Sequence, residues 1–150
     1  MEAWRTLMSL QDEGKVRLIG ISNAYDVNLL HALSRERKVQ VVQNRWYQGN
    51  EWDRLVHTYC KHNDVMYQSF WTLSGSPSLL SHPQLRALAA AANCTPEQAV
   101  FKLAQLEGVT PLSGTTSIIH MEQDMAVDSI QFPPEESEKS LSAIRQILSG

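Results

Sequence analysis

Four short apolar segments rich in β-branched residues recur along this chain of 150 residues, and they limit its fold more than any other feature. The segments are Val16–Ile21, Val39–Gln43, Val65–Phe70 and Val109–Leu112. Because these runs are almost continuously apolar, they predict strands that are covered on both faces, as in parallel sheets. Parallel neighbours need long crossover connections, so helices are expected between the strands.

Helical patterns occupy the intervals as this scheme requires. An apolar stripe begins with Trp4, Leu7 and Met8, and a cleaner one runs from Trp52 to Cys60 at helical spacing. A shorter face follows in the third interval, made by Leu85, Leu88, Ala89 and Ala92.

The next helix has the clearest boundaries in the sequence. Thr95, Pro96 and Gln98 supply an N-cap, a first-turn proline and a capping-box partner, and Gly108 is a typical residue just after a helix end. A short helix is expected near His120–Met125, and a terminal helix after Pro133 with Leu141, Ile144 and Leu148 on one side. The chain therefore reads as one domain over residues 1–150.

Four consecutive parallel strands joined by right-handed crossovers curl into an arc. The expected fold class is therefore α/β, as half of a (β/α)8 TIM barrel with alternating helices. Its stretch "VRLIGISN" ends in Ser22 and Asn23, where a barrel strand delivers functional groups to the C-terminal face. Both residue types are also common where a strand simply ends in a turn, so a structural role is the alternative.

Composition narrows the classes of partner. The chain is 43% hydrophobic and 19% charged, and its formal charge of −3 gives no basic footprint for nucleic acid or membrane. No apolar run approaches the roughly 20 residues that span a bilayer, and no signal peptide is evident. Cys60 and Cys94 lack metal-ligand spacing and are expected to be reduced. We expect a cytoplasmic protein with no metal, nucleic acid or membrane partner.

Four longer motifs allow a comparison with a known family. In this order and spacing, "GKVRLIGISN", "VVQNRWY", "YQSFWTLSG" and "GVTPLSGTTSIIHMEQDM" resemble the C-terminal half of an aldo-keto reductase, over nearly the whole chain. The resemblance implies a (β/α)8 barrel that reduces carbonyls with a nicotinamide coenzyme, NADP or NAD.

The resemblance also implies roles for individual residues. Ser22, Asn23 and Gln43 would hydrogen-bond the nicotinamide carboxamide, and Phe70 would stack on the nicotinamide ring. The remaining residues would lie along the pyrophosphate, the adenosine ribose and the adenine: Leu73, Ser113, Gly114, Thr115, Thr116, Gln123 and Asp124. Leu112 and His120 stand where many members carry a lysine and an arginine for the 2′-phosphate, so selectivity for NADP is not implied.

The family's catalytic aspartate, tyrosine, lysine and histidine lie on its first four strands, and this sequence begins before the fifth. We therefore expect a truncated domain without the tetrad, and the catalytic residue is unknown, with Tyr47 and His120 as candidates. Trp46, Tyr47 and Trp71 are expected to line an apolar substrate pocket, although packing in the core would explain them equally. His31, His57 and His62 are predicted to be surface residues.

Half a barrel leaves unpaired backbone groups on its first and last strands. Two copies could close it as a homodimer, with Val16–Ile21 of one against Val109–Leu112 of the other, and this is the solution we expect. The terminal segment 133–150 or a separate protein could instead cover the edges.

Three functions remain open at this point. The first is a repurposed enzyme that performs cyclisation, isomerisation or dehydration of an apolar carbonyl-bearing metabolite. The second is the coenzyme-binding half of an NAD(P)H-dependent carbonyl reductase, inactive alone. The third is a non-catalytic binding or regulatory subunit. For the first, the lining would be Ser22, Asn23, Gln43, Trp46, Tyr47, Phe70 and His120.

Overall fold

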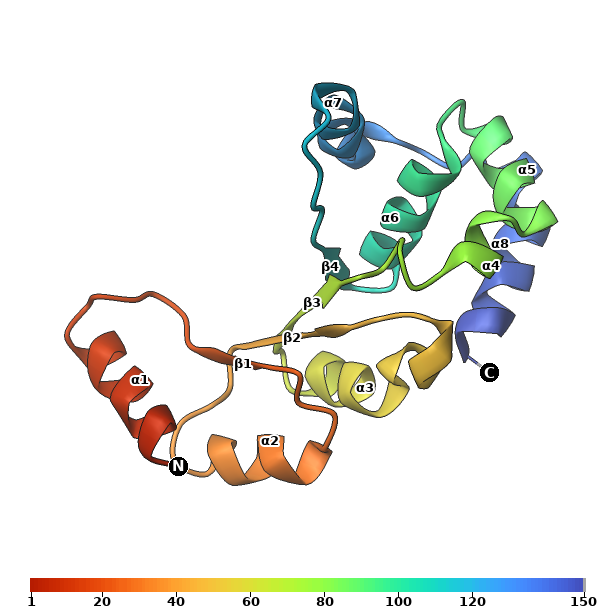
Figure 1. Ribbon diagram of the computed structural model, residues 1–150. Coiled ribbons are helices and arrows are strands. Elements are labelled where there is room, and N and C mark those ends of the chain that lie inside the picture. The colour runs from red at the N-terminus through yellow and green to blue at the C-terminus, as the bar shows by residue number, and fades with distance from the viewer. Residues whose placement is uncertain (150) are drawn as a thin grey trace.

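The computed structural model describes residues 1–149, apart from the side chain of Glu136. Its four strands are β1 (Gly20–Ser22), β2 (Val41–Arg45), β3 (Met66–Phe70) and β4 (Val109–Pro111). They form one parallel sheet in the order β1-β2-β3-β4, so each strand pairs with its neighbour in sequence (Figure 1). The predicted half-barrel alternation of strands and helices is confirmed.

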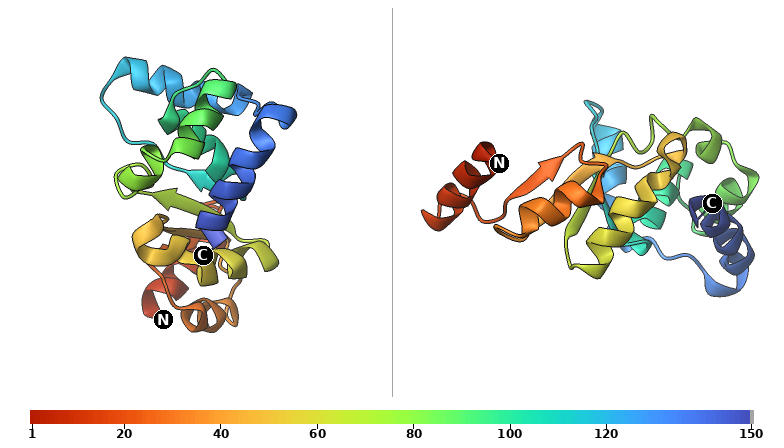
Figure 2. Two further views of the ribbon diagram at one scale, coloured as in Figure 1. Left: turned by 90° about the vertical axis from the view of Figure 1, so that its right-hand side faces the viewer. Right: turned by 90° about the horizontal axis from the view of Figure 1, so that it is seen from below.

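The helices follow the convex side of this curved sheet (Figures 1 and 2). They are α1 (Glu2–Asp12), α2 (Val27–Ser34), α3 (Arg54–His62), α4 (Pro77–Leu80), α5 (Pro83–Ala91), α6 (Pro96–Leu106), α7 (Ile118–Ala126) and α8 (Pro134–Ser149). Two short 3-10 helices, η1 (Gln48–Asp53) and η2 (Val127–Ser129), complete the order.

All four strands differ from the prediction at one or both ends, although β3 and β4 differ by a single residue, at Met66 and Pro111. β1 begins at Gly20 rather than Val16, because the preceding residues leave the sheet and Leu18 is exposed. β2 starts and ends two residues later than predicted, at Val41 and Arg45. The capping box is confirmed: Thr95 Oγ1 accepts from the Gln98 N–H at 3.2 Å, and Gln98 Oε1 accepts from the Thr95 N–H at 3.0 Å.

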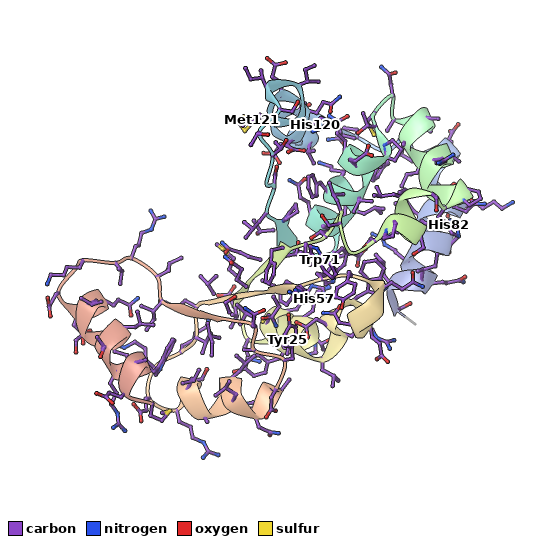
Figure 3. The ribbon with its side chains drawn as sticks, viewed as in Figure 1. Tyr25, His57, Trp71, His82, His120 and Met121 are labelled. Atoms are coloured by element: carbon purple, nitrogen blue, oxygen red, sulfur yellow. The ribbon has the colours of Figure 1, made fainter. Side chains whose placement is uncertain are left out.

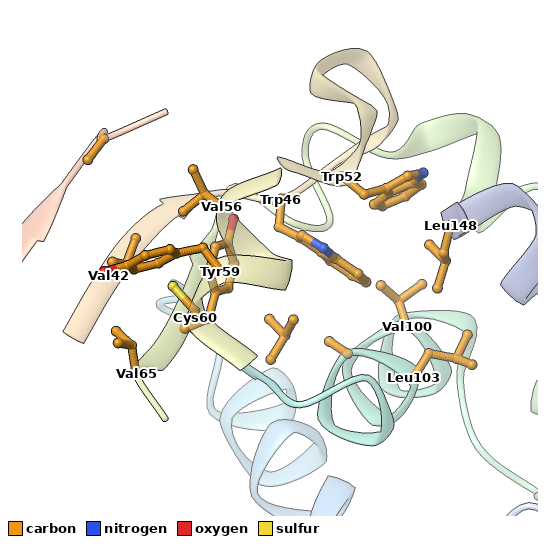
Figure 4. Packing of buried hydrophobic residues seen from close by; sticks show 14 of the residues in the cluster. Val42, Trp46, Trp52, Val56, Tyr59, Cys60, Val65, Val100, Leu103 and Leu148 are labelled. Carbon is orange, nitrogen blue, oxygen red and sulfur yellow. The ribbon is translucent and has the colours of Figure 1, made fainter. Parts of the chain in front are cut away.

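The hydrophobic core lies between the sheet and the outer helices. Alternate strand residues such as Val42, Tyr67 and Val109 point outward and are buried. Figure 4 shows Val42, Val56, Tyr59 and Cys60 packed together in this layer. The strands are thus covered on their outer face.

The inner face is different, and the prediction of strands buried on both sides is wrong there. Its residues are partly or fully exposed; they are Val41, Gln43, Arg45, Met66, Gln68, Phe70 and Thr110. The physical reason is the arc itself, since in a closed barrel the opposite strands fill the interior. In the described residues the concave side faces open space.

The terminal helix α8 packs on the outer helices. Ser140 Oγ donates to Gln84 Oε1 of α5 at 2.9 Å, and Trp52 Nε1 of η1 donates to the Ile147 carbonyl at 3.1 Å. The alternative that residues 133–150 cover a sheet edge is therefore wrong. Within the described residues, β1 and β4 each keep one unpaired edge.

Candidate functional site

A cleft of about 670 Å³ lies where β3 and β4 end. Its walls are the segments after these two strands, the N-terminal turn of α6 and one side of α7. Most of the residues assigned to the coenzyme by resemblance line it: Phe70, Leu73, Ser113, Gly114, Thr115, Gln123 and Asp124. Trp71 and His120 line it too, and Figure 3 shows His120 on α7. Thr116 belongs to the same loop but is not among the lining residues.

The loop between β4 and α7 is held by its own hydroxyl groups. Ser113 Oγ donates to the Asp124 carboxylate. Thr115 Oγ1 accepts from the Ser117 N–H at 3.1 Å and lies 3.4 Å from His120 Nδ1. Ser117 caps α7 by accepting from the His120 N–H at 3.4 Å. The cleft therefore ends at a hydroxyl-rich helix N-terminus, a setting that favours negative charge.

Ser22, Asn23 and Gln43 come together as predicted, but they lie outside this cleft. Ser22 and Gln43 line a shallower hollow of about 520 Å³ on the inner face of the sheet. Ser22 Oγ donates to the Gln43 carbonyl at 2.8 Å, and Asn23 Nδ2 donates to Ser22 Oγ at 3.1 Å. Gln43 Nε2 donates to Gln68 Oε1 at 3.0 Å. Gln43 Oε1 has no donor among the described residues and stays open to a ligand amide.

A buried polar network supports this strand end from the outer side. Asn44 Oδ1 accepts from the Ala24 N–H at 2.9 Å, and Asn44 Nδ2 donates to the Ala24 carbonyl at 2.8 Å and to Asp53 Oδ2 at 2.6 Å. Tyr67 OH donates to the same Asp53 oxygen at 2.7 Å. Burial raises the pKa of both the Asp53 carboxyl and the Tyr67 hydroxyl. The network fixes the turn at Asn23, whose φ is +55°.

An aromatic group with one cation lies at the end of β2 and β3. The rings of Tyr47 and Trp71 meet edge to face at a centroid distance of 5.0 Å. Arg45 Cζ lies 4.9 Å from the Trp71 ring centroid and 5.9 Å from that of Phe70. A side chain at Gly75 would approach the Tyr47 ring to 2.9 Å, so glycine is required for this packing. Tyr47 is thus held against Trp71, outside the set of cleft-lining residues.

Two side-chain predictions are corrected by burial. Trp46 is 2% exposed and packs on Trp52 at 4.8 Å between ring centroids, so it belongs to the core and not to a substrate pocket (Figure 4). His57 is half-buried against Tyr67 instead of on the surface, because the side of α3 that carries it faces the sheet, and burial lowers its pKa. His31 and His62 are exposed as predicted.

Leu112 lines the cleft, as its place at the family's 2′-phosphate position implied, but several lining residues were not identified from the sequence: Thr72, Ser74, Thr95, Glu97, Gln98 and Phe101. A signal for three of them was present in the capping box. In a β/α barrel each outer helix runs antiparallel to the strands. Its N-terminus therefore lies at the C-terminal face of the sheet, near the end of the preceding strand. Thr95, Glu97 and Gln98 lie in this cap and first turn.

Two further features bear on cofactors. Among the described residues no group of three or more histidine, cysteine or acidic side chains is placed to hold a metal ion. Cys60 and Cys94 are free thiols, and burial raises the pKa of Cys60 to about 12.

No helix in the described part of the chain is long and apolar enough to cross a bilayer.

A larger hollow of about 770 Å³ runs along α8 and is lined by that helix alone. It brings no groups from different elements together, and its residues carry none of the predicted functions. The cleft at the strand ends is therefore the candidate site.

Comparison with known proteins identifies the family that the sequence motifs resemble. Residues 1–80, just over half of the chain, match the model of the "Aldo/keto reductase family". A probable NAD(P)H-dependent D-xylose reductase of Emericella nidulans is 28% identical over 164 aligned positions, covering 99% of this chain and 50% of that protein. The chain spans about half the length of the curated relatives it matches.

Solved structures share the fold. An aldo/keto reductase from Brucella melitensis superposes with a TM-score of 0.76 at 19% identity, over 94% of this chain and 54% of that one. A silkworm (Bombyx mori) aldo-keto reductase complexed with NADPH superposes with a TM-score of 0.76 at 17% identity, over 93% of this chain and 46% of its own. At these identities the likeness establishes the half-barrel fold.

Proposed function

Since this chain belongs to the aldo/keto reductase family, we propose that its cleft binds the adenosine and pyrophosphate portion of a nicotinamide coenzyme. The observation that carries the proposal is the gathering of residues from β3, the β4–α7 loop and α7 around one cleft. These residues are separated by up to 54 positions in the sequence, from Phe70 to Asp124, and only the fold brings them together.

The residues present fit such a group. Phe70 offers an aromatic face at the strand end, and the hydroxyl-rich loop Ser113–Thr116 leads into the N-terminus of α7. Gln43 Oε1 is available to accept from a carboxamide N–H on the inner face of the sheet. When bound, the coenzyme would supply a hydride to a carbonyl carbon. This chain would bind and orient it, and the strands that close the barrel would complete the site.

Selectivity between the two coenzymes follows from two positions. Leu112 and His120 line the cleft where the resemblance places a lysine and an arginine in many relatives. A neutral side chain at Leu112 offers no charge to a 2′-phosphate, so we expect NADH and NADPH to bind with similar affinity.

The other two functions have less support. Curated relatives are described as an oxidoreductase, a dehydrogenase and a reductase, and none of these names describes cyclisation, isomerisation or dehydration. The cleft shows groups suited to a coenzyme, and no described feature favours a purely regulatory role.

We also propose that a second copy of the chain completes the barrel. An exposed apolar side chain lies next to each edge strand in the sequence: Leu18 precedes β1 and is 43% exposed, and Leu112 follows β4 and is 36% exposed. A twofold axis along the barrel would pair β1 of one copy with β4 of the other, which satisfies both edges at once.

Gly114 provides a sharp test of coenzyme binding. A Cβ atom at this glycine meets no atom within 4 Å, so a larger side chain can be accommodated without disturbing the core. We expect Gly114→Phe to fill the cleft and weaken binding of NADH and NADPH at least tenfold, and Gly114→Ala to leave it nearly unchanged. Tryptophan fluorescence titration of the whole chain measures both affinities. Equal affinities for the two variants and the parent chain would contradict the proposal.

A further inference from the structure

Arg45 is the last residue of β2 and lies on the inner face of the sheet. Strand alternation places it on the same side as Val41 and Gln43, while Val42 and Asn44 point into the core. In the sheet register Arg45 lies opposite Phe70, the aromatic residue at the end of the cleft. An exposed cation is thus placed beside the site and not within the protein core.

The backbone of Arg45 is fixed on both sides. Its N–H donates to Tyr25 OH at 3.2 Å, and its carbonyl accepts from Asn50 Nδ2 at 2.7 Å. These contacts come from the turn after β1 and from η1, so two separate segments hold the Arg45 backbone. The side chain therefore leaves the sheet from a defined point.

The guanidinium group itself rests on aromatic rings. Its Cζ lies 4.9 Å from the Trp71 centroid and 5.9 Å from the Phe70 centroid. Stacking uses the flat face of the guanidinium group and leaves its N–H groups, which lie in the plane, free to donate. In the described part of the chain no carboxylate lies within ion-pair distance of Arg45, whereas Arg5, Arg37 and Arg145 each have one.

Trp71, the platform for this cation, is also held in place. Its φ is +60°, its carbonyl accepts from the Gly75 N–H at 2.8 Å, and its ring packs against Tyr47. A left-handed conformation at a bulky residue costs free energy and persists where surrounding contacts determine it. The cation and its support are therefore arranged before any ligand arrives.

We propose that Arg45, stacked on Trp71, binds the carboxylate of an anionic carbonyl substrate. The assignment rests on the proposed function, because the ring of Phe70 next to Arg45 is where the nicotinamide would lie. A planar guanidinium matches a carboxylate with two parallel hydrogen bonds. The substrate class is a keto acid or an aldehyde acid, whose carbonyl would lie over the coenzyme while its carboxylate contacts Arg45. Two carboxylates also line the cleft, Glu97 of α6 and Asp124 of α7. Neither forms an ion pair with Arg45, and Asp124 accepts from Ser113.

The test compares an acid with its neutral ester. Phenylglyoxylate and methyl phenylglyoxylate are titrated into the whole chain, with and without saturating NADPH, and tryptophan fluorescence is recorded. We expect the acid to bind at least tenfold more tightly than the ester. Arg45→Gln should abolish that preference, and Arg45→Lys should retain part of it, since lysine keeps the charge and loses the planar fork. Arg86→Gln is the matched control, because Arg86 is an exposed arginine on α5 that lines neither the cleft nor the inner-face hollow.

The outcomes separate the possibilities. Equal binding of acid and ester, or no binding of either, overturns the anion subsite. A tenfold loss of NADPH affinity in Arg45→Gln assigns the cation to a coenzyme phosphate and overturns the substrate assignment. If the parent chain prefers the acid but does not bind NADPH, the subsite stands and the proposed coenzyme function fails. Circular dichroism of each variant shows that the fold is kept.

Discussion

Asn44 holds the backbone of Ala24 by two hydrogen bonds, one from the Ala24 N–H at 2.9 Å and one to the Ala24 carbonyl at 2.8 Å. Ala24 directly follows Ser22 and Asn23, and its N–H and carbonyl bond the Asn44 side chain where a strand residue would bond a neighbouring backbone. Both residues are buried, so this pair determines how the turn after β1 leaves the sheet. The position of Asn23, a predicted coenzyme contact, depends on it.

Removing this pair should cost considerable stability. Asn44→Ala leaves the Ala24 N–H and carbonyl without a side-chain partner and removes one of the two donors to Asp53, and buried unsatisfied polar groups cost about 1–3 kcal/mol each. We expect the free energy of unfolding to fall by about 2–4 kcal/mol. Urea denaturation measures it, with the exposed Asn28→Ala as control. A loss below about 0.5 kcal/mol, as for an ordinary surface substitution, would show that the pair is not needed for the fold.

The stability of the chain should depend on pH through Asp53. Burial raises the pKa of this carboxyl above its ordinary value of 3.8, so the folded state binds the proton more tightly than the unfolded state. Protonated Asp53 therefore adds to the free energy of unfolding. This addition is fully present below pH 3.8 and is lost as pH rises through the pKa of Asp53 in the folded state. Asparagine at position 53 does not titrate, so Asp53→Asn should reduce the decrease in the free energy of unfolding with pH. Urea denaturation from pH 4 upward measures this decrease. The exposed Asp64→Asn should keep the parent slope, and an unchanged slope in Asp53→Asn would contradict the assignment.

Coenzyme selectivity should respond to the residue at position 112. Leu112→Lys places a cation in the cleft where the family resemblance puts one, so NADPH should gain about tenfold over NADH, about 1.4 kcal/mol. The gain should shrink at high salt because the site is partly exposed. Fluorescence titration with both coenzymes measures the ratio, and Leu112→Met is the neutral control. A ratio that does not change would mean that the 2′-phosphate lies elsewhere.

The proposed dimer should depend on Leu18, the exposed apolar residue just before β1. Leu18→Lys introduces a charge next to this edge strand and should shift the chain toward monomer, as measured by light scattering over a range of concentrations. Leu55→Lys is the control, since Leu55 is 78% exposed on α3, away from both edges. A parent chain that is monomeric at every concentration would rule out closure by a second copy.

Local sequence patterns determined the elements of this fold and their order. β-branched runs fix strands, and the capping box of Thr95 and Gln98 fixes the start of α6, because these preferences act over a few residues. The quoted motifs also identified most of the residues that line the cleft. A single residue's role was less well determined, because Trp46 and Trp71 have the same chemistry and only one of them is in the core.

Tertiary structure decided which side chains share a space. Strand register places Arg45 against Phe70, and the alternation of β2, which continues past Arg45, carries Trp46 into the core beside Trp52. The Asn44–Asp53–Tyr67 network likewise joins residues from β2, η1 and β3. Local preferences carry no information on such contacts, because they depend on how the strands pair and how the sheet curves. Local patterns thus predicted a half-barrel with a polar strand end, whereas packing across the sheet selects the residues that form its site.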